Sequence, residues 1–551
     1  ATATVNITQN AEIGLEQDTE IVTFSAETGS VTSSNVIWAA SDINVTAGTD
    51  VSSGSSQWTA DTGSVTVAAD EDVTLNNRIE ANDNISVTAK HALNAGNQLL
   101  LAATGDISLS GGDVSVGVAG AEATAGNIDI DATLTDAAIR GDLTAGNGIA
   151  VDAAGAISTA EAVLDAHGDD GDVVLTAGSN INLGIGSAEA GDDVILTAGE
   201  NINQIGDIRA NTHAGNTELD SEGDVILTAT TGAITTTGQV LSGVNYTADA
   251  ANSITLGDLA GAANNGNIDV TGNVHVGQNI EPTGDIDFNA DINADGEVLV
   301  DGGHDITLAA TEDIIAVGDV NIDAGATALV DGDINGHDIT LRGEHALLID
   351  GELNATGETN LSGGTIDATS AITSATDVTV RSDEEVTLAE VEALGGFVDI
   401  YGGGHVTLNG DIEATTDVTV FSLDAGITQI GNIGTKVAVD TADNVTLTAA
   451  VGTIVSSGNI NAVNDITIDA HTDATLSALL VADTGNVNLL SNNADVVGLS
   501  GSAIEATVGD VNVTAGSDVS LADTVNAGTD FNLNAVETIT LGGAVTTGGA
   551  V

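Results

Sequence analysis

The sequence predicts an all-β protein, an elongated parallel β-solenoid with triangular coils of about 20 residues. Three observations predict this fold. A phrase of alternating polar and apolar residues recurs at a fixed period, each period contains three such phrases, and the composition suits short strands joined by tight corners. No stretch of useful length shows the 3.6-residue period of an amphipathic helix.

The recurring phrase is a small polar residue, Val or Ile, another polar residue, and Leu or Val. Its first apolar residues are alternately 8 and 12 residues apart at Val378, Val386, Val398, Val406 and Val418. Two such steps give a period of about 20 residues, and a fixed period of this length is the signature of a solenoid in which each repeat forms one rung. Alternation of apolar and polar residues within the phrase is typical of a half-buried strand.

Each rung is predicted to have three sides. The 12-residue interval contains a weaker third phrase, such as Ile412 between Val406 and Val418. Gly, Asn or Asp stands at most of the corners between phrases. By the alternation, Val406 and Leu408 are expected to point inward and Thr407 outward. At about 20 residues per coil the chain should contain roughly 27 coils, which at about 4.8 Å each would form a rod on the order of 130 Å long.

The composition agrees with tightly turned, stacked strands. The chain has 68 glycines, which suit tight corners, and one proline, which suits a structure where nearly every backbone N–H donates to a ladder. A hydrophobic content of 42% argues against a disordered acidic chain. A length of 551 residues would usually suggest several domains, but the core of a solenoid grows along one axis.

The amino-terminal part of the chain is less regular than the rest. We expect residues 1–40 to form an N-terminal cap or an assembly strand region, and residues 41–551 to form a continuous β-solenoid of repeated coils. Trp38 and Trp58 suggest a larger hydrophobic plug over the end coil, because an open solenoid end is an exposed edge.

Some stretches break the period, including the long interval from Val487 to Val511. Between Ile306 and Ile339 the spacing shortens, as if one of the three sides were omitted. The interval from Ile202 to Val225 contains an insertion that includes His213.

Several phrases resemble the repeats of filamentous haemagglutinin-type proteins, which are very large bacterial surface and secreted proteins. The resemblance is carried by residues 171–178 (GDVVLTAG), 223–229 (GDVILTA) and 443–449 (DNVTLTA), and it extends over nearly the whole chain. It implies a right-handed parallel β-helix shaft and an extracellular or cell-surface location. The family's amino-terminal secretion domain has Asn-Pro-Asn-type motifs, whereas the single proline here is Pro282.

The chain is expected to be secreted and N-terminally processed, because it contains no methionine and begins at Ala1. No apolar run approaches the roughly 18–20 residues needed to span a bilayer, so direct membrane insertion is not expected. The absence of cysteine is compatible with a secreted protein that is not stabilised by disulfides.

The chain is strongly acidic, with 82 Asp and Glu residues, seven Lys and Arg residues, and a formal net charge of −75. The basic residues are scattered along the sequence, which predicts no basic patch and no nucleic-acid partner. Stacked carboxylates repel one another unless they are screened. Two alternatives stay open: a solvated acidic surface that salt screens, or Ca²⁺ bound between coils or between chains.

Two acidic clusters are candidate calcium sites. The candidate ligands are Asp165, Asp169, Asp170, Asp172, Asp291, Asn293 and Asp295. The first four form a dense acidic corner. The last three place oxygens on alternate residues before a glycine, as a calcium loop does, although Gly302 occupies the position where such a loop has its bidentate Glu. Calcium is the only cofactor considered, and its binding would be structural.

No catalytic constellation is recognisable. The nine His residues include Gly-His corners at 303–304, 336–337 and 404–405, but no His-Glu-x-x-His spacing occurs. These His residues are interpreted as solvent-facing corner residues. Since no Gly-x-Ser-x-Gly motif or complete dinucleotide-binding loop occurs either, we expect the protein not to be an enzyme.

Three classes of function are compatible with these features. The leading class is an extracellular structural protein, a self-assembling fibre, matrix or surface-layer subunit. The alternative is the stalk of a surface adhesin that binds host or neighbouring-cell ligands, such as a cell-surface carbohydrate. A polysaccharide-active β-helix enzyme is the least favoured class, because it needs basic residues and aromatic sugar platforms gathered in a groove, and here both are dispersed.

For the structural class, homopolymerisation by end-to-end or strand-addition contacts is expected. Residues 2–8 alternate polar and apolar side chains and could add as a strand to another subunit. The competing interpretation makes the same residues an ordinary first strand of their own coil.

Overall fold

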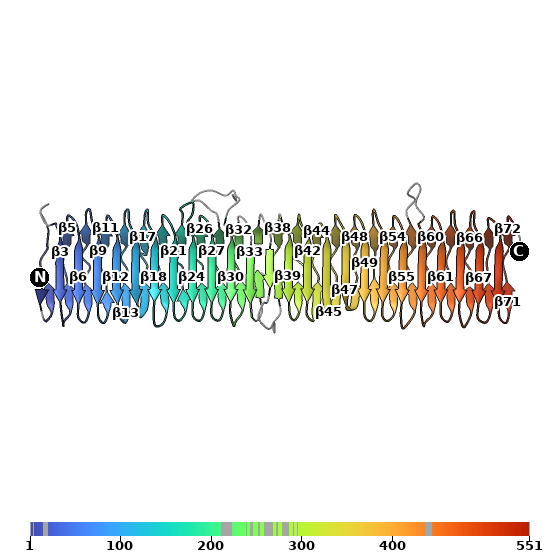
Figure 1. The fold of residues 1–551 in the computed structure, drawn as a ribbon, viewed down its shortest axis with the longest axis horizontal. Helices are drawn as coiled ribbons and strands as arrows, with labels where there is room; N and C mark the ends of the chain where they lie inside the picture. Colours follow the sequence, from blue (N-terminus) through green and yellow to red (C-terminus); the bar gives the residue numbers. More distant parts are fainter. Residues whose placement is uncertain are drawn as a thin grey trace. The chain divides into compact units, whose positions relative to one another are not determined.

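The computed structural model is a parallel β-solenoid of about 23 turns spaced roughly 21 residues apart. It describes residues 2–3, 5–14, 20–210, 223–238, 240–242, 246–251, 254–257, 268–270, 274–277, 286–289, 291–294, 296–435 and 443–549. These residues form strands that pair in parallel with strands about one turn away, and no helix occurs among them (Figure 1). The predicted fold class is therefore confirmed. The expectation of roughly 27 coils was too high, because many turns are longer than 20 residues.

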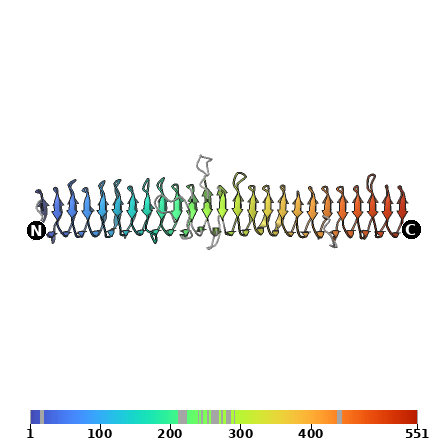
Figure 2. The same cartoon turned by 90° about the horizontal axis from the view of Figure 1, so that it is seen from above.

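The chain consists of two compact units, Ala1–Gly296 and Glu297–Val551. Within each unit, the rungs contribute strands to three parallel ladders, which are called ladders A, B and C in chain order. In the first rung, ladder C is represented only by the bridge of Ile13 to Ile37. Seen from above, successive strands of a ladder lie side by side along each unit (Figure 2).

In the first unit, ladder A contains mostly five-residue strands. Its strands are β1 (Thr2–Ala3), β3 (Val22–Ala26), β6 (Ile43–Ala47), β9 (Val65–Ala69), β12 (Ile85–Ala89), β15 (Ile107–Gly111), β18 (Ile128–Ala132), β21 (Ile149–Ala153), β24 (Val173–Ala177), β27 (Val194–Ala198), β30 (Val225–Ala229), β33 (Tyr246–Ala250) and β36 (Val274–Gly277).

Ladder B of the first unit contains shorter strands. They are β2 (Ile7–Gln9), β4 (Val31–Ser33), β7 (Val51–Ser53), β10 (Val73–Thr74), β13 (Ala92–Ala95), β16 (Asp113–Val116), β19 (Ala137–Ile139), β22 (Ile157–Ser158), β25 (Ile181–Leu183), β28 (Ile202–Gln204), β31 (Ile234–Thr236), β34 (Ile254–Gly257) and β37 (Ile286–Asn289). Ladder C contains β5 (Ile37–Ala39), β8 (Trp58–Ala60), β11 (Ile79–Ala81), β14 (Leu100–Ala102), β17 (Ala121–Ala123), β20 (Leu143–Ala145), β23 (Leu164–Ala166), β26 (Ala188–Ala190), β29 (Ile208–Ala210), β32 (Val240–Ser242), β35 (Ile268–Val270) and β38 (Ile292–Ala294).

The second unit repeats this arrangement. Its ladder A contains β39 (Val298–Gly302), β42 (Val320–Ala324), the first halves of β45 (Ile339–Ile349) and β47 (Thr359–Ala368), β49 (Val378–Ser382), β52 (Val398–Gly402), β55 (Val418–Ser422), β58 (Val445–Ala449), β61 (Ile466–Ala470), β64 (Val487–Ser491), β67 (Val511–Ala515) and β70 (Phe531–Ala535).

Ladder B of the second unit includes the second halves of β45 and β47. Its other strands are β40 (Ile306–Leu308), β43 (Thr327–Val330), β50 (Val386–Leu388), β53 (Val406–Leu408), β56 (Ile427–Gln429), β59 (Ile454–Ser456), β62 (Ala474–Leu476), β65 (Val496–Gly498), β68 (Val519–Leu521) and β71 (Ile539–Leu541). Ladder C contains β41 (Ile314–Ala316), β44 (Ile334–Gly336), β46 (Leu353–Ala355), β48 (Ile372–Ser374), β51 (Val391–Ala393), β54 (Ile412–Ala414), β57 (Ile433–Thr435), β60 (Ile460–Ala462), β63 (Leu480–Ala482), β66 (Ile504–Ala506), β69 (Val525–Ala527) and β72 (Val545–Thr547).

The core of each unit lies between the three ladders and follows from strand alternation. In β53, Val406 and Leu408 are fully buried while Thr407 is only half-buried, as the sequence predicts. Most buried residues pair with an apolar residue in the adjacent rung; Val406, for example, is aligned with Val386. A few buried polar residues pair with one another, as Gln9 does with Ser33. The column of side chains inside each ladder is therefore continuous, and its burial supplies the main stabilisation of the rungs.

The two Trp residues have different environments. Trp58 is buried in the core of β8. Trp38 lies on the outer side of β5, where its indole N–H donates a 3.0 Å hydrogen bond to the carboxylate of Asp61. The expected plug of two indoles over the end coil is therefore not formed, because strand parity directs Trp38 outward.

Residues 2–8 do not form a separate arm. Strand β1 pairs with β3, and β2 pairs with β4, so the described residues of this segment belong to the ladders of their own chain. This arrangement agrees with the interpretation of residues 2–8 as an ordinary first strand of their own coil.

The shortened period between Ile306 and Ile339 has a different cause from the one expected. All three sides are present, since β41 and β44 continue ladder C through this stretch. Strands β45 and β47 pass through the corner between ladders A and B as continuous strands with a bulge between Gly343 and Ala346. The rung before Ile339 is short because only His337 and Asp338 separate β44 from β45, and the bulge follows this stretch. The predicted insertion around His213 lies outside the described residues.

Candidate functional site

Many corners of the solenoid contain a side-chain ladder. The carboxylate of Asp338, just before β45, accepts a 2.8 Å hydrogen bond from the backbone N–H of Glu358, just before β47. Asn127 accepts a similar bond from the N–H of Gly148. Further acceptors of this kind, at the corners before all three ladders, are Asp42, Asp106, Asp142, Asp193, Asp305, Asp333, Asp411, Asp465 and Asp518.

This side-chain ladder gives many of the acidic residues a structural role. A backbone N–H at a rung corner has no partner in the regular β-ladders, and an unpaired N–H is costly when it is shielded from water. Asp and Asn carry an oxygen one bond from Cβ, which is short enough to reach the next rung. The recurrence of Asp and Asn before the strands is therefore explained without a ligand.

The four acids of the first predicted calcium cluster do not gather into one site. Asp165 lies on β23 beside His167, whose Nδ1 is 4.0 Å from its carboxylate. Burial raises the pKa of Asp165; His167 lowers it, and Glu189 in the next rung raises it. Asp169 and Asp170 are exposed residues of the following turn.

The fourth acid, Asp172, belongs to a different group. Its carboxylate oxygen lies within 4.8 Å of those of Asp192 and Asp193, which belong to the next rung. Asp172 accepts a 3.1 Å bond from the N–H of Asp193, and Asp193 accepts a 2.7 Å bond from the N–H of Asp224. The pKa of Asp193 is raised, first by burial and then by the carboxylates of Asp224 and Asp172, while the Asp224 N–H lowers it.

The second predicted calcium cluster is only partly described. Asp291 precedes β38, and Asn293 is an outward residue of that strand, aligned with Asp269. Asp295 lies outside the described residues. Calcium binding by either cluster stays a prediction.

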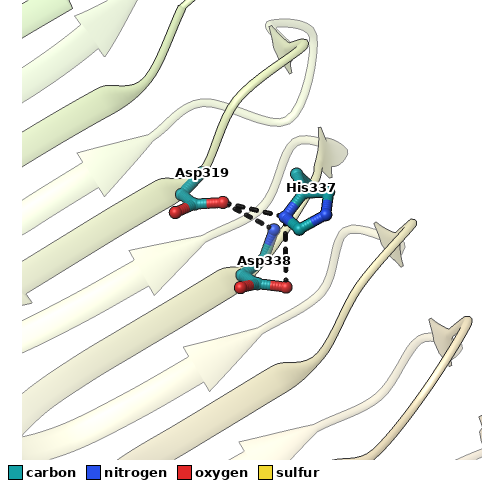
Figure 3. Close-up of side chains that lie close together, drawn as sticks. All are labelled: Asp319, His337 and Asp338. Atoms are coloured by element: carbon teal, nitrogen blue, oxygen red, sulfur yellow. Dashed lines mark hydrogen bonds and ion pairs between the residues drawn. The ribbon is translucent and has the colours of Figure 1, made fainter.

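A mixed group of one His and two Asp residues lies at the corner before ladder A in the second unit (Figure 3). The Nδ1 atom of His337 is 3.1 Å from Asp319 and 3.3 Å from Asp338. The same Asp319 oxygen accepts the backbone N–H of Asp338 at 3.2 Å. The imidazole therefore extends the corner ladder, in keeping with the interpretation of the Gly-His corners as solvent-facing.

The second unit also has an open groove on the outer side of ladder A. It has a volume of about 410 Å³ and is lined by Arg342, Ser362, Arg381 and Tyr401, with Glu344 and Asp383 at the adjoining corner. Arg342, Ser362, Arg381 and Tyr401 occupy aligned positions in consecutive strands β45, β47, β49 and β52. The groove exists because Ser362, which is small, lies between two Arg side chains.

An aromatic pair continues the same column. Phe421 of β55 is aligned with Tyr401, and the two rings are stacked with centroids 5.4 Å apart and planes 9° from parallel. Both side chains are half-buried on the outer surface. Offset stacking holds the two rings in one orientation.

The guanidinium groups beside the groove are held by carboxylates. The Nη1 group of Arg342 donates to both carboxylate oxygens of Asp323, at 2.8 and 3.1 Å, and Nη2 of Arg381 is 3.3 Å from Asp399. Side-chain exposures of 48% for Arg342 and 63% for Arg381 leave much of each guanidinium open to a ligand.

This groove was missed by the sequence reasoning, which treats the basic and aromatic residues as dispersed. That interpretation was wrong for this part of the chain, because residues one rung apart are neighbours in space. The spacing contains the signal: Arg381, Tyr401 and Phe421 each occupy the fourth position of their five-residue strands.

Comparison with known proteins found no match: no family, no curated protein and no solved structure resembles the chain at a significant level. Within the described ranges, no helix of the length and hydropathy needed to cross a membrane occurs.

Proposed function

We propose that this protein is an extracellular structural protein, a self-assembling subunit of a fibre, matrix or surface layer. Its regular rungs and corner ladders support this proposal, because they give many of the acidic residues a role in connecting one rung to the next. The extracellular location rests on the resemblance to haemagglutinin-type repeats, with which a parallel β-solenoid is compatible.

End-to-end assembly is proposed because rungs of one geometry can pair with one another in parallel, whether they belong to one chain or to two. In β71, which belongs to the last described rung, Ile539 and Leu541 are 47% and 40% exposed. The aligned residues of the preceding rung, Val519 and Leu521, are 1% and 3% exposed. These values show what pairing with a further rung buries at this position of the ladder.

We propose that β71 pairs with the first rung of a second copy of this chain. Strand β2 of that rung presents Ile7 half-buried, whereas its aligned neighbour Val31 is fully buried. Strands β2 and β71 both pair in parallel within ladder B, so a contact between them would repeat the pairing of neighbouring rungs. A contact between unlike ends does not close on itself and therefore propagates into a filament.

The test compares three forms of the chain by negative-stain electron microscopy and sedimentation. The wild type and a Thr540→Lys control, altered at an exposed residue between Ile539 and Leu541, should form filaments. Leu541→Lys should not, because a charge would be buried at the joint. Circular dichroism confirms that all three retain their strands. Absence of wild-type filaments, or equal filaments from Leu541→Lys, would overturn the proposal.

The second candidate function is the stalk of a surface adhesin. The groove beside Tyr401 favours it, because that groove offers an outer surface to a ligand. We propose no catalytic role for either form.

A further inference from the structure

We propose that the groove over Ser362 binds a short segment of a neutral carbohydrate chain. The groove lies on the outer side of one unit, so the proposal goes beyond assembly and does not depend on it. It is formed by consecutive strands from β45 to β52, whose pairing fixes the spacing of its walls. Its volume of about 410 Å³ is within the range of small-molecule sites.

The aromatic wall supplies the apolar contact. Phe421 covers one face of the Tyr401 ring, and the opposite face is directed toward the rung of Arg381, where the groove lies. A flat apolar ring face in an otherwise polar groove suits the C–H face of a pyranose ring. The stacked partner holds the Tyr401 ring in place, which lowers the entropy cost of binding.

The polar lining supplies the hydrogen bonds. A guanidinium has five N–H donors, and Arg342 directs only its Nη1 group toward Asp323. Arg381 reaches Asp399 through Nη2. The remaining donors, together with the carboxylate acceptors of Glu344 and Asp383 that line the groove, match the mixed donor and acceptor character of sugar hydroxyls.

The local charge selects a neutral chain over an anionic one. Each guanidinium is already compensated by its own carboxylate, Asp323 for Arg342 and Asp399 for Arg381. Two further acids line the groove, so its net charge is negative. The formal charge of −75 on the whole chain adds to the repulsion of a polyanion.

The experiment is isothermal titration of the full chain with defined hexasaccharides. The neutral probes are cellohexaose, maltohexaose, xylohexaose and mannohexaose, and the anionic probe is hexagalacturonate. At least one neutral probe should bind saturably and with little dependence on NaCl concentration, because no net charge is neutralised. Failure of all four neutral probes, or binding of hexagalacturonate alone, would overturn the proposal.

Matched variants locate the site. Tyr401→Ala should weaken binding of the neutral probe about tenfold, corresponding to about 1.4 kcal/mol, and Tyr401→Phe should retain it. Thr448→Ala is the control, because Thr448 occupies the same strand position one rung beyond Phe421. If Tyr401→Ala and Thr448→Ala bind alike, the groove is not the site. Filament formation by all of these variants should be unchanged, so failure here leaves the assembly proposal intact.

Discussion

The carboxylate of Asp377 accepts a 2.9 Å hydrogen bond from the backbone N–H of Phe397, twenty residues later in the chain and one rung further along ladder A. Asp377 directly precedes β49, and Phe397 directly precedes β52. The bond therefore connects two rungs at a corner, where the regular backbone ladder has not yet begun. Its repetition at other corners extends rung-to-rung pairing into the turns.

Removing the Asp377 carboxylate should lower the local stability of the corner that contains Phe397. Asp377→Ala is expected to cost about 1 kcal/mol locally, because it leaves the Phe397 N–H unpaired. Asp377→Asn should cost much less, since an Asn oxygen has the same role at Asn127. Hydrogen exchange of the peptide containing Phe397 measures the effect directly. Equal protection of that peptide in the Ala and Asn variants would contradict the structural role of the corner acids.

The alternation of inward and outward side chains along β53 gives a second prediction. Val406→Asp should destabilise the protein by several kcal/mol, because it buries a charge without a partner. Thr407→Ser, on the outer side of the same strand, should change stability little. Thermal melts rank the two variants. A larger loss for Thr407→Ser would mean that the strand register is wrong.

The raised pKa of Asp193 predicts a pH-dependent effect. Because its folded pKa lies above the unfolded value, the stability it contributes is present below about pH 4 and is lost as pH rises through the folded pKa. Asp193→Asn keeps an oxygen for the Asp224 N–H and removes the charge. The variant should therefore melt higher than wild type at pH 7, and the difference should shrink toward pH 3. A difference that is independent of pH would contradict the assignment.

Cation dependence distinguishes coordination from screening. If Asp172, Asp192 and Asp193 or other acids bind Ca²⁺, millimolar CaCl₂ should raise the melting temperature more than NaCl at equal ionic strength, and EDTA should reverse the rise. Asp193→Asn should reduce the calcium effect if this group is the site. Identical melting temperatures in CaCl₂ and NaCl would show that the acidic surface is only screened.

The fold could be predicted from the sequence because the same pattern of polar and apolar residues recurs in each rung of a solenoid. The parity of Val406 and Leu408 and the three sides of each rung follow from local alternation alone. The bulge between Gly343 and Ala346 could not be predicted in this way, because β45 has only one more residue there than the aligned part of β47. Trp38 was placed in a plug because its size suggested burial, although its strand position directs it outward.

The candidate sites were harder to predict for a physical reason. Asp172 was grouped with acids near it in sequence, whereas its carboxylate lies beside Asp192 and Asp193 of the next rung. Arg381 and Tyr401 were treated as isolated for the same reason. In stacked rungs the nearest neighbours of a side chain are about one period away, and the changing length of the turns obscures that alignment.

The most direct test of the central claim is cryo-electron microscopy of the purified, assembled protein. The account predicts filaments in which the β-ladders continue from one copy into the next, with the spacing of about 4.8 Å between rungs preserved across the joint between the β71 end and the β2 end. Discrete particles that never join, or copies that associate side by side with β71 still exposed, would contradict it.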